Sequence, residues 1–497
     1  MNSKKAINIS IYIIIFVSIF SFIISRPISD LDEIWNYNFA KNVADGRVPY
    51  RDFNMVITPM LSLLCGIILK ITTNHLLIMR IIAAISCSFI IFLIYQILKQ
   101  FNVNNKLMVI CLSFIFYLYN GIICIDDNWI SLLIALVSVF LEIREYEKNK
   151  ESLIVNTKLD IFIGILAGMS FLTKQTSGLL ICIVVLGNKL IDVKNIENFK
   201  VYLKKFLFRI IGILIPLAIT LIYLLVNNAF DDFLSYTLKG ASSFTNYISY
   251  FSLFDSCVTG VLAILVPTFM LIELYKTVIK DRNKKMYYLF VYGLAIFIIT
   301  FPISNKIHFV IGATPIISIL IIEANTIIEF LYKKFIKNKN TLKKFLIIIL
   351  YIISFIFAFI IILSTLKNYI NYAKSNHSQL NNFRYLPIDE NIEQMIKFVD
   401  DYIINNNKDV KILDSSAAIY MIPINKYNKD FDMFNTGNFG YKGEERLKKE
   451  VSSSNNVEYL ILKEKYPLNW QAPLNIIEYV KKSKKRIGEI AIFDIYN

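Results

Sequence analysis

The chain of 497 residues is 56% hydrophobic, has a mean hydropathy of +0.53, and collects its apolar residues in long blocks. Because a soluble domain rarely exceeds half apolar residues, this composition excludes a soluble protein and predicts an α-helical polytopic membrane protein. The net charge of +15 does not point to nucleic acid, since the basic residues concentrate in loops where anionic lipid headgroups attract them. All six cysteines lie in or beside apolar blocks, so no disulfide framework or zinc-like spacing is readable.

The first apolar block, residues 7–25, follows a basic start and is not followed by a small-residue cleavage site. We therefore expect an uncleaved signal anchor. Eleven further blocks lie at residues 55–71, 75–97, 107–124, 128–143, 159–173, 176–192, 207–226, 254–275, 287–301, 308–330 and 345–366. Together they predict a transmembrane module over residues 1–366.

Residues 367–497 have a different, polar composition. Short β-like runs at 410–414, 457–462 and 490–496 alternate there with helical or turn-like stretches. This alternation predicts a small α/β domain over residues 367–497.

The distribution of lysine and arginine predicts the orientation of the chain in the membrane. Four loops carry 4, 4, 5 and 6 of these residues, namely 144–158, 193–206, 276–285 and 333–344. The alternate loops 227–252 and 302–307 carry one each. By the positive-inside rule, the four basic loops and the N-terminus are cytoplasmic, whereas the first outer loop, 26–54, and the C-terminal domain are extracytoplasmic.

One consequence of this orientation concerns the number of crossings. Asp126 and Asp127 must also lie outside, yet three apolar runs separate them from the first outer loop. We therefore expect that one of the runs 55–71, 75–97 and 107–124 does not span the membrane. This leaves about eleven transmembrane helices.

The first outer loop contains an acidic helix start. The apolar spacing from Asp30 to Ala44 predicts a short amphipathic helix on the outer surface, with Trp35 and Tyr37 at headgroup depth. In one interpretation, Ser29 or Asp30 caps this helix, and the carboxylates of residues 32 and 33 favour its positive first turn.

A second acidic pair, Asp126 and Asp127, begins another helix on the same predicted face. An N-cap is again one interpretation. However, two acidic pairs that meet at one membrane surface also form the kind of constellation that general-base or metal-assisted chemistry requires.

Several cations accompany the acidic pairs. Lys174 lies in the predicted outer turn "FLTKQTSG", and Lys306 and His308 lie in "FPISNKIHF". A lysine that only snorkels from a helix end is the alternative for Lys174, and the same alternative holds for Arg80, which lies inside an apolar run.

Taken in order, these motifs resemble the GT-C-type, polyprenyl-phosphate-dependent glycosyltransferases, which include the protein O-mannosyltransferases and the bacterial lipid A aminoarabinose transferases. The positions similar to that family's first outer loop are Asp32, Glu33, Ala40, Gly46, Pro49, Tyr50, Asp52, Phe53 and Pro59. The segments "YNGIICIDDN", "GILAGMSFLTKQTSGLL" and "FPISNKIHFVIGATP" are similar to its later motifs. The resemblance covers roughly residues 7–330.

The resemblance implies an inverting hexosyl- or pentosyltransferase that acts at the outer face of the membrane. Its implied partners are a polyprenyl-phosphate-linked sugar, an acceptor glycan, lipid or protein, and membrane lipids, without nucleic acid. Asp32 would be the general base, while Glu33, Asp126 and Asp127 would orient the base, the acceptor or a divalent cation. Asp32 and Asp127 are the candidate ligands of such a cation.

The departing polyprenyl phosphate gains negative charge, which nearby cations would stabilise. The candidates for this role are Lys174, Arg47, Arg51 and His308.

A polytopic transporter or a lipid or glycan flippase is the alternative function, because many crossings and basic inner loops fit it equally well. Transport sites usually show ionisable residues or broken helices near the bilayer midplane. Here the charges cluster at one face, and the apolar runs after residue 128 look uninterrupted. A signalling or assembly subunit would leave the two acidic pairs unexplained, so the sequence favours the transferase.

Overall fold

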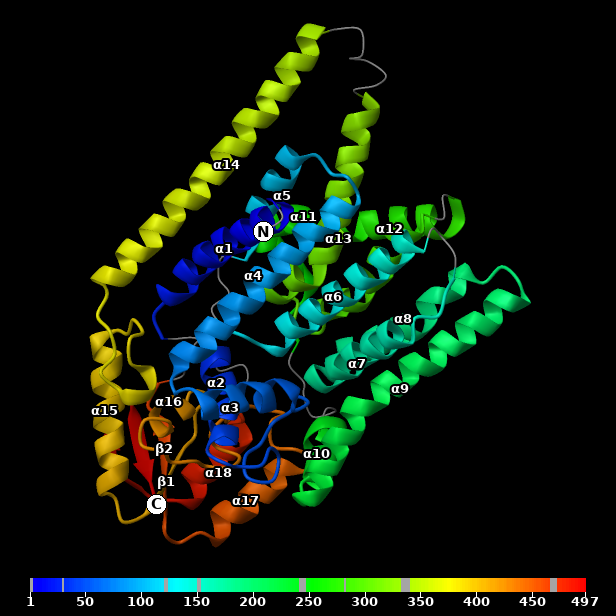
Figure 1. The fold of residues 1–497 in the computed structure, drawn as a ribbon. Helices are drawn as coiled ribbons and strands as arrows, with labels where there is room; N and C mark the ends of the chain where they lie inside the picture. Colours follow the sequence, from blue (N-terminus) through cyan, green and yellow to red (C-terminus); the bar gives the residue numbers. More distant parts are fainter. Residues whose placement is uncertain are drawn as a thin grey trace.

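The computed structural model describes residues 3–28, 31–119, 124–149, 153–240, 247–280, 283–331, 340–464 and 472–497. It consists of a long helical module followed by a small α/β domain, which Figure 1 shows gathered at one end of the helices. The predicted fold class, a polytopic helical protein with a small C-terminal α/β domain, is confirmed.

The helical module contains most of the described helices. Its α-helices are α1 (Ser3–Ile24), α2 (Leu31–Ala44), α3 (Met60–Ile71), α4 (Leu76–Gln100), α5 (Asn105–Leu118), α6 (Asp127–Lys148), α7 (Thr157–Thr173), α8 (Gln175–Gly187), α9 (Ile196–Val226), α10 (Phe230–Phe233), α11 (Cys257–Leu274), α12 (Lys284–Phe297), α13 (Lys306–Leu331) and α14 (Asn340–Lys374). The predicted division between residues 366 and 367 stays a prediction, and α14 itself continues to Lys374.

Seven helical stretches within the described ranges are long and apolar enough to cross a membrane. They are Lys5–Ile24, Leu76–Gln100, Gln175–Asp192, Ile196–Val226, Cys257–Thr277, Lys306–Leu331 and Ile348–Lys374. At about 1.5 Å per residue, α3 and α5 reach only about 18 and 21 Å, less than the roughly 30 Å of a bilayer core. Two of the three runs suspected of not spanning, 55–71 and 107–124, thus form helices that are short for a crossing. The count of eleven crossings stays a prediction.

Helices α7 and α9 cross very closely because glycines lie at their contact. A Cβ atom added to Gly164 would lie 2.2 Å from the carbonyl oxygen of Arg209, and one added to Gly212 would lie 2.2 Å from that of Ile161. Small residues allow membrane helices to approach in this way. Helix α7, which makes this crossing, ends immediately before Lys174.

We expect Gly212→Ala to destabilise the protein by about 1–3 kcal/mol, because the added methyl group overpacks the contact and forces the two backbones apart. Gly187→Ala is the matched control, since nothing lies within 4 Å of a Cβ atom at that helix end. The measurement is the unfolding temperature of both variants in detergent. If the two variants unfold at the same temperature as the wild type, the close crossing does not contribute to stability.

The C-terminal domain is built on a four-stranded sheet. Its strands are β1 (Asp409–Ile412), β2 (Val457–Leu462), β3 (Arg486–Ile490) and β4 (Phe493–Tyr496), in the order β1-β2-β4-β3. Strands β1 and β2 are parallel, with Asp409 opposite Val457, while β4 is antiparallel to both β2 and β3. The predicted run 490–496 therefore belongs to two strands, because a turn through Ala491, with φ +45°, reverses the chain.

The domain's helices are α15 (Glu390–Asn405), α16 (Ala418–Met421), α17 (Gly443–Ser453) and α18 (Leu474–Ser483). Central strand β2 is apolar along most of its length because both of its faces are covered. Tyr459 and Ile461 pack in one buried cluster with residues of α17 and α18, whereas Leu460, on the other face, belongs to the large core that continues into the membrane helices.

Helix α2 matches the predicted helix, but it does not lie open on the outer surface of the protein. Trp35 and Tyr37 are 8% and 0% exposed. The Trp35 indole N–H donates to the carbonyl of Ser415 at 2.7 Å, and the Tyr37 hydroxyl donates to that of Asn74 at 2.7 Å. Because the polar atoms of both rings find partners in the protein, α2 is buried between the membrane helices and the C-terminal domain. The capping residues predicted at 29 and 30 lie outside the described residues.

Candidate active site

A cavity of about 430 Å³ lies where the membrane helices meet the C-terminal domain. The ionisable side chains that line it are Asp32, Asp126, Asp127, Lys174 and His308. They come from the starts of α2, α6 and α13 and from the junction between α7 and α8. The fold thus gathers five of the eight predicted site residues around one space.

Asp126 caps α6, as the structural interpretation of this pair predicted. Its Oδ1 accepts a hydrogen bond from the Trp129 backbone N–H at 2.9 Å. Burial raises the pKa of the Asp126 carboxyl, and the adjacent charge of Asp127 raises it further. Asp126 therefore holds the start of α6 in the cavity wall.

Lys174 faces the second acidic pair, so the snorkelling alternative does not describe it. The residue is extended, with φ −148° and ψ 113°, and separates the end of α7 from the start of α8. Its Nζ lies 3.2 Å from Asp127 Oδ2 and also donates to Asn128 Oδ1. The ammonium group is thus positioned at the cavity by residues of α6.

Asp32 and His308 lie on other walls of the same cavity. Asp32 is exposed in the first turn of α2, and the Asn36 side-chain amide donates to its backbone carbonyl at 2.8 Å. His308 lies in the first turn of α13, where its Nδ1 is 2.9 Å from Asn305 Oδ1. The carboxylate of Asp32 and the ammonium group of Lys174 therefore share one cavity.

Glu33 does not line the cavity, contrary to the role that the family resemblance implied for it. Its carboxylate forms a bidentate ion pair with Arg80. The Nε–Oε1 distance is 2.7 Å and the Nη2–Oε2 distance is 2.8 Å. The side chains of both residues are at most 1% exposed. Arg80 Nη1 also donates to the carbonyls of Ile23 and Arg26. Arg80 is therefore a buried anchor between α1, α2 and α4, and the snorkelling alternative for it is wrong.

Arg47 and Arg51 also lie away from the cavity lining. The Arg47 guanidinium lies 3.5 Å from the centre of the Tyr427 ring, in a cation–π contact with the C-terminal domain. Arg51 donates to both carboxylate oxygens of Asp52, at 2.8 and 2.9 Å, and this lowers the pKa of Asp52. Both arginines thus fix the loop after α2 rather than contributing to the cavity.

Sequence reasoning missed the uncharged part of the lining. Asn128 and Gln175 follow predicted site residues directly, and this adjacency was the available signal. The segment 433–438 of the C-terminal domain also contributes Met433, Asn435, Thr436, Gly437 and Asn438. Nothing local in that segment signals a site, because it reaches the cavity only through the packing of the two domains.

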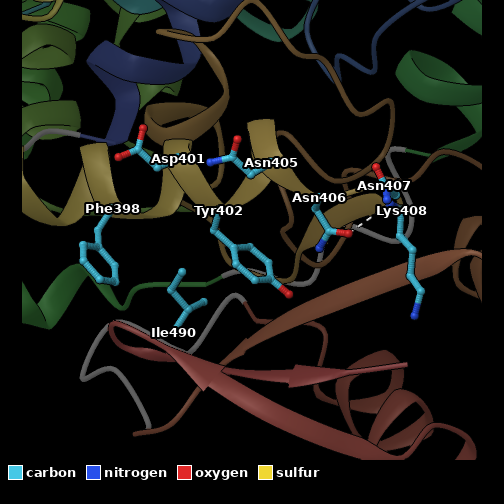
Figure 2. A pocket seen from close by; sticks show the side chains of 8 residues that line it. All are labelled: Phe398, Asp401, Tyr402, Asn405, Asn406, Asn407, Lys408 and Ile490. Carbon is cyan, nitrogen blue, oxygen red and sulfur yellow. Dashed lines mark hydrogen bonds between the residues drawn. The ribbon is translucent and has the colours of Figure 1, made fainter.

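A second hollow, of about 630 Å³, lies on the C-terminal domain between α15 and the end of β3. Its lining residues are Phe398, Asp401, Tyr402, Asn405, Asn406, Asn407, Lys408 and Ile490. In Figure 2 the Phe398 and Tyr402 rings point toward Ile490, whereas Asp401 and Asn405 point to the other side of the helix. None of the predicted site residues lies here, so we take the cavity around Asp32 and Lys174 as the candidate active site.

Asp32 and Asp127 are the candidate ligands of a divalent cation, if the protein uses one. In the described part of the chain, no group of three or more His, Cys, Asp or Glu side chains is arranged to hold a metal ion. Asp127 is instead engaged with Lys174.

Comparisons with known proteins give one family model and two similar solved structures. The family model for dolichyl-phosphate-mannose-protein mannosyltransferases matches residues 57–215, from the segment before α3 into α9. The crystal structure of ArnT from Cupriavidus metallidurans bound to undecaprenyl phosphate is similar, with TM-score 0.52 and 9% identity, over 100% of this chain and 98% of that one. The crystal structure of the Archaeoglobus fulgidus oligosaccharyltransferase in the apo form gives TM-score 0.49 and 13% identity, over 92% and 69%. No curated protein sequence gives a significant match.

Proposed function

We propose that this chain transfers a sugar from a polyprenyl phosphate to an acceptor at the outer face of the membrane. The premise is that it belongs to the GT-C-type, polyprenyl-phosphate-dependent glycosyltransferases. One observation carries the proposal. A single cavity brings together Asp32, the Asp126–Asp127 pair and Lys174, which are a proton acceptor, a positioning pair and a cation.

A lipid-linked donor fits the position of the cavity. Nucleotide sugars are highly charged and stay in the cytoplasm, so a transferase at the outer face needs a sugar that a lipid carries across. An ammonium group has three N–H donors, and in the described residues Lys174 gives two of them to Asp127 and Asn128. The third would bind the donor's phosphate. The ArnT neighbour is bound to undecaprenyl phosphate, which supports a donor of this class.

The proposed reaction is a single displacement. Asp32 takes the proton from an acceptor hydroxyl as its oxygen attacks the anomeric carbon of the donor sugar. The bond between that carbon and the phosphate oxygen breaks, so the configuration inverts and the polyprenyl phosphate leaves with an additional negative charge. Lys174 stabilises that charge. Asp127 keeps the lysine in place, and Asp126 holds α6.

Replacing Lys174 with Gln tests the donor site. A charge-assisted hydrogen bond to phosphate is worth about 1.5–3 kcal/mol, so we expect donor use to fall roughly 10- to 100-fold. The loss should be the same for different acceptors. The measurement is the transfer of labelled sugar from a panel of undecaprenyl-phosphoryl hexoses and pentoses by the purified protein.

Lys306→Gln is the matched control, because Lys306 is exposed at the start of α13 and does not line the cavity. It should transfer like the wild type. Full activity in Lys174→Gln would remove Lys174 from the site. A wild-type protein that transfers from none of these donors, yet moves a lipid-linked glycan across vesicle membranes, would favour the flippase alternative.

A further inference from the structure

Residues 433–438 of the C-terminal domain, called the wall segment below, contribute to the lining of the candidate active site. Within the segment, the side chains of Met433 and Thr436 are partly exposed, whereas Asn435 and Asn438 are buried. The segment contains no charged residue. The surface that it presents to the cavity is therefore made mainly by one apolar and one hydroxyl-bearing side chain.

A single side chain from the first outer loop ties the two ends of the wall segment together. Asn54, which is 2% exposed, donates from Nδ2 to the Asn438 carbonyl at 2.6 Å and accepts the Asp430 N–H through Oδ1 at 3.1 Å. One bond thus lies just before the segment and the other at its end. Because both polar atoms of the amide are used, Asn54 fixes the position of the wall segment against the membrane module.

Other contacts hold Asp430 independently of Asn54. The Asp430 carboxylate accepts from the two Nη atoms of Arg446, at 2.5 and 2.9 Å, and from the Tyr236 hydroxyl at 2.8 Å. Arg446 also donates to the Phe439 carbonyl at 3.0 Å. These bonds remain when Asn54 is replaced, so its loss should loosen the wall segment without detaching the domain.

The wall segment adjoins the side of the cavity that carries Asp32. Met433 packs against the apolar cluster that includes Trp35 and Phe39. These two rings lie three and seven positions after Asp32 on α2, so the three residues share one face of the helix, and all three line the cavity. Lys174, in contrast, lies at the junction between α7 and α8 and is held by α6.

The proposed reaction assigns different substrates to these two sides, because the acceptor hydroxyl must reach Asp32 and the donor phosphate must reach Lys174. We propose that the wall segment forms the acceptor side of the cavity and that Asn54 is a positioning residue that holds it there. The inference rests on the proposed function and adds the C-terminal domain to the acceptor site. The part of the acceptor beside the attacking hydroxyl is then uncharged, since a charge placed against this segment would lose its hydration without gaining a partner.

Replacement of Asn54 with Ala tests the positioning role. The acceptor must then order the wall segment as it binds, so the KM for the acceptor should rise roughly 2- to 12-fold, the effect of about one hydrogen bond. The KM for the donor, and kcat at saturating acceptor, should match the wild type, because both side-chain bonds of Asn54 go to the backbone at 430 and 438.

Asn382→Ala is the matched control. Asn382 is also a buried asparagine that joins the C-terminal domain to the membrane module, through bonds of 3.1 Å from Nδ2 to the Tyr37 hydroxyl and to the Asn74 carbonyl. It does not line the cavity. Its replacement should lower the unfolding temperature about as much as Asn54→Ala does but leave the KM for the acceptor unchanged. An Asn54 with a merely structural role would behave in the same way as Asn382.

Thr436→Val is a second test that leaves the bonds of Asn54 in place. Val keeps the shape of the side chain and removes the hydroxyl, so the KM for the acceptor should rise while that for the donor stays the same. In the Asn54→Ala/Thr436→Val double variant, the two effects should be less than multiplicative, because both act through the same segment.

The measurements use the purified protein with labelled undecaprenyl-phosphoryl hexoses and pentoses as donors. The acceptors are octyl glycosides and threonine-containing peptides, and the one that the wild type glycosylates fastest serves for the KM series. An unchanged acceptor KM in both Asn54→Ala and Thr436→Val would overturn the inference. An equal rise of the donor and acceptor KM values in Asn54→Ala, or kinetics equal to those of Asn382→Ala, would also overturn it. A wild-type protein that glycosylates none of these acceptors would instead contradict the proposed function.

Discussion

Replacement of Asp32 with Asn is expected to reduce sugar transfer by about 10²-fold or more, the scale of a general-base contribution. Asn keeps the size of the side chain but cannot take the proton from the acceptor hydroxyl. Asp32 lies exposed in the first turn of α2 at the cavity. The variant should therefore still insert into the membrane and bind undecaprenyl phosphate, and the rate of transfer is the quantity to measure.

Asp255→Asn is the control, because Asp255 is exposed and lies outside the cavity lining. Its rate should match the wild type. A near-normal rate in Asp32→Asn would contradict Asp32 as the base and move the assignment to Asp126. That residue lines the cavity but is already engaged as the cap of α6. Glu33 is not a substitute, since its carboxylate is paired with Arg80.

Replacement of Glu33 with Ala is expected to destabilise the protein by about 3–5 kcal/mol, the usual result of removing one partner of a buried ion pair. The Arg80 guanidinium would stay buried between α1, α2 and α4 without its counter-charge. The measurement is the unfolding temperature of the purified variant in detergent, together with the yield of protein in the membrane.

A double variant separates the ion pair from any role in catalysis. Replacing a whole buried pair with apolar residues is often neutral, so Glu33→Leu with Arg80→Met should recover much of the lost stability and of the transfer. If Glu33→Ala instead unfolds at the wild-type temperature but transfers no sugar, Glu33 acts in the reaction and its assignment as an anchor is wrong.

Asp32 and Glu33 show how much of a site a sequence motif can predict. Neighbouring residues on a helix point about 100° apart, so an acidic pair seldom faces one site with both members. The sequence placed both residues in the first turn of a helix, and the structure confirms this. Only the packing of α4 against α1 and α2 shows that Asp32 faces the cavity while Glu33 meets Arg80.

The sequence by itself determined the membrane class, the small α/β domain and most helix positions, because block length, composition and periodicity are local properties. It also placed Asp32 in the first outer loop, and the second acidic pair, Lys174 and His308 at the ends of apolar blocks. Such ends tend to meet at one face of a membrane protein. The cavity lining agrees with that expectation.

The tertiary structure alone decided which charges face the cavity and which are buried as anchors. Trp35 is buried because its indole N–H meets Ser415, 380 residues away in the chain. Asn435 and Asn438 reach the cavity in the same way, through the contact of Asn438 with Asn54. A contact between such distant residues leaves no periodic pattern in either segment, because it depends on how the finished elements pack.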